Sequence, residues 1–178
     1  MGLVHIYHGD GKGKTTAAVG LAVRAIGAGH HVLFQQFLKD GKSSELEVLR
    51  DIGITVDSGR PLGAEGFTWE MSEAQLTLLR ESQDARLSRA RTYLERHSSS
   101  GVIILDESIA SINYNLLNKS LLLDFMNEIR TLEDGPDLVL TGREPAMELL
   151  DLADYISEVK ANRHPFDHGV MGRKGIEY

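Results

Sequence analysis

The chain has 178 residues, of which 42% are hydrophobic and 25% charged, so we expect one ordinary globular domain over residues 1–178. It contains no cysteine, which excludes disulfides, thiolate metal sites and a cysteine nucleophile. Its formal net charge of −7 argues against a nucleic-acid-binding or membrane-binding surface, because phosphate-rich partners reward excess Lys and Arg.

The sequence also lacks the features of a membrane or secreted protein. No segment approaches the run of about 18 apolar residues that a membrane span needs. The first residues, MGLVHIYHGD, have no basic region followed by an apolar stretch, so they do not resemble a signal peptide. We therefore expect a cytoplasmic location and no membrane partner.

Segments typical of strands and helices alternate along the chain. Strands are expected over residues 3–7, 32–38, 54–56, 102–105, 138–143 and 155–159. Helices are expected over residues 14–26, 44–52, 119–131 and 146–153, with a long one starting at residue 72. This alternation predicts an α/β fold with a mostly parallel sheet.

The region between residues 60 and 94 changes character once. Residues 60–69 contain glycine and no regular pattern, which predicts a loop. Ser72 then begins the long helix, and Gln75 stands in capping-box position. The apolar stripe of this helix consists of Leu76, Leu79, Leu87, Ala90 and Leu94.

A glycine-rich segment follows the first expected strand and departs from the usual phosphate-binding pattern G-x-x-x-x-G-K-[ST]. Gly13, Lys14 and Thr15 supply the end of that pattern, but His8 occupies the first glycine position and Gly9 comes one residue late. A loop between a strand and a helix directs backbone N–H groups into one concavity, where a phosphate binds. The alternative is a glycine turn with chance lysines, and the flanking strand and helix favour the phosphate site. The expected triphosphate-binding residues are Gly9, Asp10, Gly11, Lys12, Gly13, Lys14, Thr15 and Thr16.

Two acidic residues end a buried strand. Asp106 and Glu107 follow the apolar residues 102–105, as acids of the Walker B type do, and carboxylates there can hold Mg²⁺ together with the Thr15 hydroxyl. The alternative is that Asp106 caps a helix N-terminus. Together with the glycine loop, the metal role is favoured. These features indicate a nucleoside triphosphate site without fixing the reaction.

Several separate segments, in this order, resemble the P-loop corrinoid adenosyltransferases. They are GDGKGKTTAAVGLAVRAIGAG (9–29), QFLK (36–39), GFTWE (66–70), ILDESIASINYNLL (104–117), TGR (141–143), LADYISEV (152–159), RHPFDHG (163–169) and GIEY (175–178). The resemblance implies a P-loop (RecA-like) three-layer fold. It also implies transfer of the 5′-deoxyadenosyl group of ATP to a reduced Co(I) corrinoid, with tripolyphosphate leaving intact. By the same resemblance ATP lies in reversed polarity, and Thr15 and Glu107 are Mg²⁺ ligands with Asp106 nearby.

The segment GFTWE carries the expected corrinoid contacts. If residues 67–69 are extended, Phe67 and Trp69 project to the same side. The resemblance implies that both rings lie beside the corrin and displace the lower axial ligand of Co(II). The alternative is ordinary core packing of an aromatic pair.

Weaker candidates and partners complete the set. Arg143 in TGR is a loop cation that could meet phosphate or corrinoid amides, and His164 and His168 could line the corrinoid site. The resemblance implies a homodimer and a reducing flavoprotein or similar electron donor. Longer family members carry an N-terminal extension over the corrinoid site, whereas this sequence starts almost at its first strand, so we expect that site to close differently. The competing functions are a P-loop kinase or NTPase and a non-catalytic ATP-dependent corrinoid carrier.

Overall fold

A computed structural model describes residues 2–97, 100–163, 169 and 171–176. Within these residues a single sheet of parallel strands runs in the order β3-β2-β4-β5-β1-β6. The strands are β1 (Val4–His8), β2 (His31–Gln36), β3 (Thr55–Asp57), β4 (Gly101–Asp106), β5 (Asp137–Gly142) and β6 (Tyr155–Glu158). The predicted α/β fold is confirmed. The sheet is parallel throughout because helical crossovers return the chain to the end of the sheet where the previous strand began.

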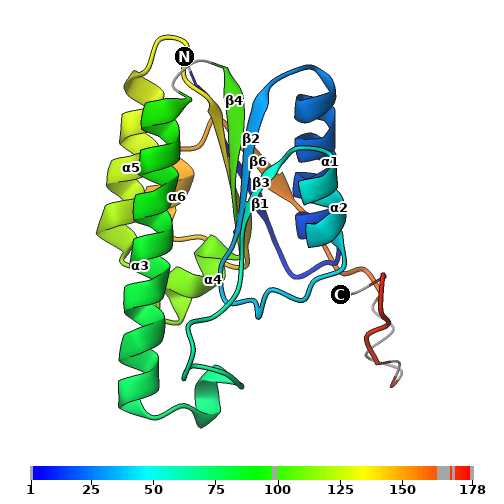
Figure 1. Ribbon diagram of the computed structural model, residues 1–178, viewed down its shortest axis with the longest axis vertical. Helices are drawn as coiled ribbons and strands as arrows, with labels where there is room; N and C mark the ends of the chain where they lie inside the picture. The colour runs from blue at the N-terminus through cyan, green and yellow to red at the C-terminus, as the bar shows by residue number, and fades with distance from the viewer. Residues whose placement is uncertain (1, 98–99, 164–168, 170, 177–178) are drawn as a thin grey trace.

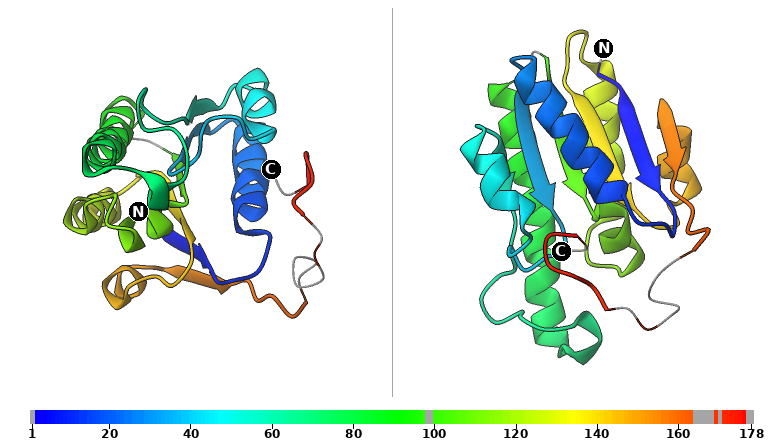
Figure 2. Two further views of the ribbon diagram at one scale, coloured as in Figure 1. Left: turned by 90° about the horizontal axis from the view of Figure 1, so that it is seen from below. Right: turned by 90° about the vertical axis from the view of Figure 1, so that its right-hand side faces the viewer.

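Helices cover both faces of the sheet and make three layers (Figure 1, Figure 2). One face carries α1 (Lys14–Gly27) and α2 (Glu45–Asp51). The other carries α3 (Glu73–Arg96), α4 (Ser108–Asn113), α5 (Lys119–Thr131) and α6 (Met147–Asp151). The three-layer arrangement agrees with the sequence-based expectation.

Each face of the sheet has its own apolar core. Small side chains of α1, such as Ala18 and Ala22, are fully buried against Phe34 and Ile104, so this helix lies close to the sheet. On the opposite face α3 and α5 pack on Ile103 and its neighbours. Successive residues of β4 therefore serve opposite cores, as expected for a strand buried on both sides.

The start of α3 is as predicted. The backbone N–H of Gln75 donates to Ser72 Oγ at 3.4 Å, and the Ser72 N–H donates to Gln75 Oε1 at 3.0 Å. Leu79, Leu87 and Leu94 are buried along the helix. In the described part of the chain no helix has both the length and the apolar character needed to cross a bilayer.

Two features differ from the sequence-based expectation. Helix α4 directly follows the acidic pair and was not predicted, because its six residues are too few for a helical period to appear. Strand β2 ends at Gln36 rather than residue 38. Leu38 has a φ of 61°, which no strand tolerates, and the N–H of Phe37 donates to the carbonyl of Asp106 at 2.8 Å.

Candidate functional site

The glycine loop occupies the turn between β1 and α1, at the carboxyl ends of the parallel strands. Gly9 and Gly13 have φ angles of 114° and 123°, which side chains rarely allow. The loop thus leads the backbone into the N-terminus of α1, where N–H groups and the helix dipole favour an anion.

The segment that follows β6 braces this loop from outside. Gly11 N–H donates to the carbonyl of Val159 at 2.8 Å, and the N–H of Val159 donates to His8 at 2.8 Å. A Cβ atom on Gly9 would stand 2.4 Å from the Val159 oxygen, and one on Gly11 would stand 2.7 Å from the carbonyl carbon of Lys160. Both positions therefore require glycine, because the backbone of Val159 and Lys160 lies too close for a side chain. This contact joins two segments that are far apart in the sequence.

The lysine of the loop is held inside it. Lys14 is 8% exposed, and its Nζ donates to the carbonyl of Gly11 at 2.8 Å. Burial lowers the pKa of Lys14, and the charge of Glu107 opposes this shift. Asp10 also lines the cavity at the loop, and its Oδ1 accepts a hydrogen bond from the N–H of Ala161 at 3.1 Å.

Asp106 lies fully buried beneath the loop at the centre of a polar network. Its Oδ1 accepts hydrogen bonds from the hydroxyls of Thr15 at 2.8 Å and Thr141 at 2.7 Å, and Gln36 Nε2 is 3.4 Å from its Oδ2. Burial raises the pKa of Asp106 to about 6, although the hydrogen bonds from Thr141 and Thr15 lower it. A second acid, Glu45, accepts from Gln36 Nε2 at 2.8 Å.

Glu107 occupies the capping position of α4 in an unusual backbone conformation. Its φ of 60° is left-handed, and no side chain caps the first turn of α4. Its N–H is held by the Thr141 hydroxyl at 2.9 Å. The alternative of a helix cap is therefore wrong: the carboxylate of Asp106 binds side chains of α1, β5 and β2 instead. A strained residue at a strand end is typical of functional sites.

The glycine loop and Glu107 line one cavity of about 240 Å³. Residues 10–16 of the predicted loop and the exposed Arg143 belong to the lining, whereas Gly9 and the buried Asp106 do not. Lys39 and Ile176, which the sequence analysis did not single out, also line the cavity. Lys39 belongs to the QFLK segment, so that match could have indicated it. Ile176 reaches the cavity only because the C-terminal segment returns to the α1 side (Figure 2).

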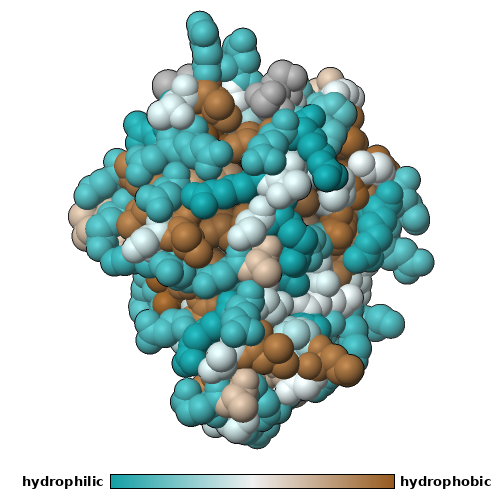
Figure 3. All heavy atoms as spheres, turned by 60° about the vertical axis from the view of Figure 1, so that its left-hand side comes forward, coloured by the Kyte–Doolittle hydropathy of each residue, from teal (hydrophilic) through white to brown (hydrophobic). Residues whose placement is uncertain are grey.

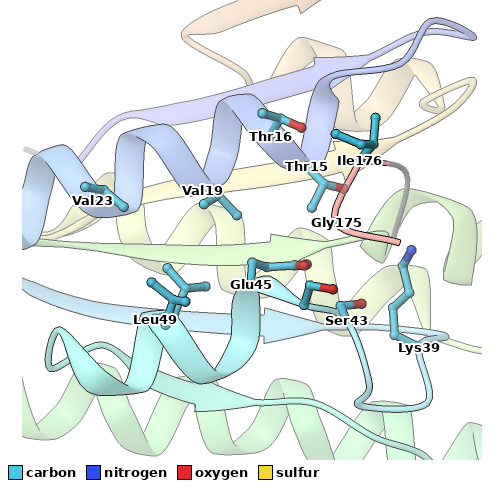
Figure 4. Close-up of a pocket in the computed structure, with 12 residues that line it drawn as sticks. Thr15, Thr16, Val19, Val23, Lys39, Ser43, Glu45, Leu49, Gly175 and Ile176 are labelled. Atoms are coloured by element: carbon cyan, nitrogen blue, oxygen red, sulfur yellow. The ribbon is translucent and has the colours of Figure 1, made fainter. Parts of the chain in front are cut away.

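A second, more apolar cavity of about 420 Å³ adjoins the first. Figure 4 shows α1 contributing Thr15, Thr16 and Val19 from one side, while α2 contributes Glu45 and Leu49 from the other. Thr15, Thr16, Lys39 and Ile176 line both cavities.

The donor atoms around Asp106 suit a hard cation. Thr15 offers a hydroxyl, and Asp106 and Glu107 offer carboxylates. Mg²⁺ prefers such oxygen ligands. Among the described residues no three His, Cys, Asp or Glu side chains gather closely enough to hold a metal ion. The hydroxyl of Thr15 and the carboxylates beside it fit Mg²⁺ that also binds phosphate oxygens, as is usual at triphosphate sites.

The aromatic pair lies on the loop between β3 and α3. Phe67 and Trp69 are 58% and 76% exposed, so core packing does not account for them. The expected extended conformation is wrong, because Thr68–Glu70 forms a 3-10 turn. The turn nevertheless brings the rings together, stacked with centroids 4.5 Å apart and planes at 12°. Hydrophobic residues gather near the lower end of the molecule in Figure 3, the end at which Figure 1 places this loop. His164 and His168 lie outside the described residues.

Comparison with known proteins decides the family. A sequence model described as "ATP:corrinoid adenosyltransferase BtuR/CobO/CobP" matches residues 1–178. The chain belongs to this family. A corrinoid adenosyltransferase of Escherichia coli K12 is 33% identical over 99% of this chain and 86% of its own length, and one of Salmonella typhimurium LT2 is 32% identical over the same shares. A third, from Pseudomonas aeruginosa, is 27% identical over 99% of this chain and 84% of its own length.

The family assignment makes this chain a transferase and agrees with the expected resemblance. Among solved structures, the Aeropyrum pernix ORC2 protein in ADPNP–ADP complexes matches 90% of this chain and 42% of that chain, with a TM-score of 0.44 and 16% identity. A likeness at that level adds nothing to the family assignment.

Proposed function

We propose that this member of the family transfers the 5′-deoxyadenosyl group of ATP to the cobalt of a Co(I) corrinoid and releases tripolyphosphate. The observation that carries the proposal is the convergence of Lys14, Lys39, Arg143 and Glu107 on one loop-lined cavity, with an exposed aromatic pair on a loop at the same end of the sheet. Family membership supports the choice of substrates.

In this proposal the glycine loop, residues 9–16, holds the triphosphate as a leaving group. Co(I) is the nucleophile: its electron pair forms the bond to C5′ of the ribose while the bond from C5′ to the phosphate oxygen breaks. No protein base is needed, since no proton moves in this step. The protein has to align the two reacting atoms and to neutralise the departing charge. Lys14 and the loop N–H groups serve the second purpose.

The oxygen ligands for Mg²⁺ in the proposal are Thr15, Asp106 and Glu107. When bound, Mg²⁺ supplies further positive charge to the departing phosphates. Thr141 and Gln36 hold the Asp106 carboxylate in place, and thereby fix the position of its oxygens relative to Thr15.

Phe67 and Trp69 take the corrinoid in the proposal. Their exposure leaves two stacked rings free to meet an apolar macrocycle and to exclude the lower ligand of Co(II). A cobalt that has lost this ligand is easier to reduce. A flavoprotein or similar electron donor, a homodimer and a cytoplasmic location are further parts of the proposal, which the family resemblance supports.

The direct test is to incubate the protein with ATP, Mg²⁺ and chemically reduced cobalamin. The adenosylated corrinoid spectrum should appear together with one tripolyphosphate per corrinoid. ADP and phosphate as products would instead indicate a kinase or NTPase. Corrinoid binding without any product would indicate a carrier.

Trp69→Ala separates the corrinoid role from a packing role. We expect near-normal thermal stability, because the ring is exposed in the free protein. Activity should fall severely when a weak biological reductant must produce Co(I), and less when Co(I) is supplied beforehand. Equal losses in both assays, accompanied by a drop in stability of about 3–5 kcal/mol, would contradict the corrinoid role.

A further inference from the structure

Arg60 joins two loops that belong to different parts of the site. Its Nε and Nη2 donate to the carbonyl of Leu38 at 3.1 and 2.8 Å. Its Nη1 donates to the carbonyl of Gly66. The planar guanidinium presents these donors in a fixed fork, so the two carbonyls are held at a set distance from each other.

The Leu38 side of this link lies next in the chain to residues of the triphosphate site. Leu38 has a left-handed φ of 61°, and the residue before it donates its N–H to the carbonyl of Asp106 at 2.8 Å. The residue after it is Lys39, which lines the phosphate cavity. A side chain anchored on Leu38 is therefore anchored on the edge of the triphosphate site.

The Gly66 side of the link leads directly into the aromatic pair. Gly66 has a φ of 96° and precedes Phe67, and the Glu70 N–H donates to the Phe67 carbonyl at 3.0 Å to close the 3-10 turn. Because Phe67 and Trp69 are mostly exposed, burial does not fix where the turn lies.

The first half of the loop has other anchors. Gln75 Nε2 donates to the carbonyl of Gly63 at 3.0 Å, and Ala64 is fully buried with Leu79 and Leu116. These contacts tie residues 63–64 to α3 and to Leu116, which follows α4. The second half of the loop starts at Gly66, and Arg60 ties it to Leu38, the residue before Lys39 of the phosphate cavity.

We propose that Arg60 is a positioning residue that sets the aromatic pair relative to the bound triphosphate. The inference rests on the proposed function, because it matters only if Phe67 and Trp69 meet the corrinoid. Arg60 touches neither substrate; it acts through the carbonyls of Leu38 and Gly66.

The test uses Arg60→Gln and Arg60→Lys. Lysine keeps the charge but cannot reproduce the fork that reaches both carbonyls. The matched control is Arg80→Gln, because Arg80 is also a half-buried arginine that donates to a loop carbonyl, that of Asn115 at 3.1 Å. It has no contact with the segment from Leu38 to Gly66 among the described interactions.

The first measurement needs no substrate. Trp69 is the single tryptophan of the chain, so fluorescence anisotropy reports directly on the aromatic pair. Both Arg60 variants should lower the anisotropy at an unchanged melting temperature, and Arg80→Gln should leave it unchanged.

The second measurement compares the two reductant conditions. With Co(II) and a weak donor, both Arg60 variants should lose about tenfold or more in rate, because a misplacement of about 1 Å can cost about a hundredfold. With Co(I) supplied, the reduction step is bypassed, and the loss in rate should be less than about threefold. The KM for ATP should stay near the wild-type value. The electron paramagnetic resonance signal of four-coordinate Co(II) should weaken in parallel.

Here the rate ratio is the rate with Co(II) and a weak donor divided by the rate with Co(I) supplied. Three outcomes would overturn the inference. The Arg60 variants could show the same anisotropy and rate ratio as Arg80→Gln, Arg60→Lys could behave as the wild type, or the losses could be equal with Co(II) and with Co(I). A failure of the proposed function would look different: the wild type would then form no adenosylated corrinoid, and a failure of the corrinoid role of the aromatic pair would leave the rate ratio of Trp69→Ala unchanged. If Trp69→Ala changes the ratio and the Arg60 variants do not, the proposed function stands and the role of Arg60 falls.

Discussion

Lys14 is a cation kept largely out of water before any substrate arrives. Its ammonium donates to a carbonyl of its own loop, and burial lowers its pKa. A charge that is already desolvated and oriented needs little reorganisation when negative charge develops on the phosphates, which is why such groups contribute strongly to catalysis.

Lys14→Ala should therefore lower kcat with saturating ATP and pre-reduced Co(I) by about a hundredfold to a thousandfold. The control is Lys42→Ala, since Lys42 is a largely exposed lysine whose Nζ is 3.9 Å from Asp40. A near-normal rate for Lys14→Ala would contradict the phosphate-loop assignment.

Glu107→Gln tests the metal role of the strained acid. The variant keeps the shape of the side chain and the backbone bond to Thr141, so the melting temperature should not change. The Mg²⁺ concentration for half-maximal rate should rise by about tenfold or more, because even groups that only support a metal ligand are worth about 10–100-fold in affinity. An unchanged Mg²⁺ dependence would return Glu107 to a structural role.

At the scale of elements, the glycine loop depends on the chain that leaves β6. The sequence shows three glycines near a lysine, but only the fold shows that Val159 and Lys160 lie against two of them. The loop is thus clamped between α1 and an edge strand, and its shape is not a local property.

Gly11→Ala should push these segments apart, because the new Cβ would stand 2.8 Å from the Val159 oxygen. We expect a loss of about 1–3 kcal/mol in the free energy of unfolding by urea, as in other overpacked sites, and a higher KM for ATP. Gly20→Ala is the control, since that position in α1 is exposed with open space around it, and alanine there should stabilise by about 0.5–1 kcal/mol. Equal stability of the two variants would show that the clamp is loose.

Some of these elements could be predicted from local sequence patterns, and others could not. The capping box at Ser72 and the buried strand before Asp106 follow from local patterns, and both were predicted. Helix α4 is too short to show a period, and the 3-10 turn at Thr68 has no local signature. The contacts of Arg60, Lys39 and Ile176 depend on which loops meet, which a one-dimensional pattern does not contain.

At the scale of the whole molecule, the same limit applies to the strand order. Alternation predicts a parallel sheet but not that β3 and β6 are its edges. At the β3 edge, Asp57 joins several elements: it accepts from Gln35 of β2 at 3.0 Å and from Arg86 and Arg89 of α3 at 3.3 and 2.9 Å. Arg86 is 3% exposed and also donates to Gln36 and Gly59 carbonyls, so this cluster supports the edge of the whole sheet.

Asp57→Asn should lower the free energy of unfolding at neutral pH by about 3 kcal/mol, because the buried charge of Arg86 loses its partner. Burial alone would raise the pKa of Asp57, but the hydrogen bonds and charges of Arg89 and Arg86 outweigh it and hold the pKa below its ordinary value. The ionised carboxylate therefore stabilises the fold fully above its unfolded pKa of about 3.9, and this contribution is lost as the pH falls through the lower folded value.

Urea unfolding from pH 7 to pH 3 should show a constant difference in the free energy of unfolding between wild type and Asp57→Asn down to about pH 5, and a shrinking difference below about pH 4. Asp124→Asn, at an exposed position of α5, is the control and should show little difference at any pH. A difference for Asp57→Asn that stayed constant down to pH 3 would mean that packing, and not the charge of Asp57, supports this edge.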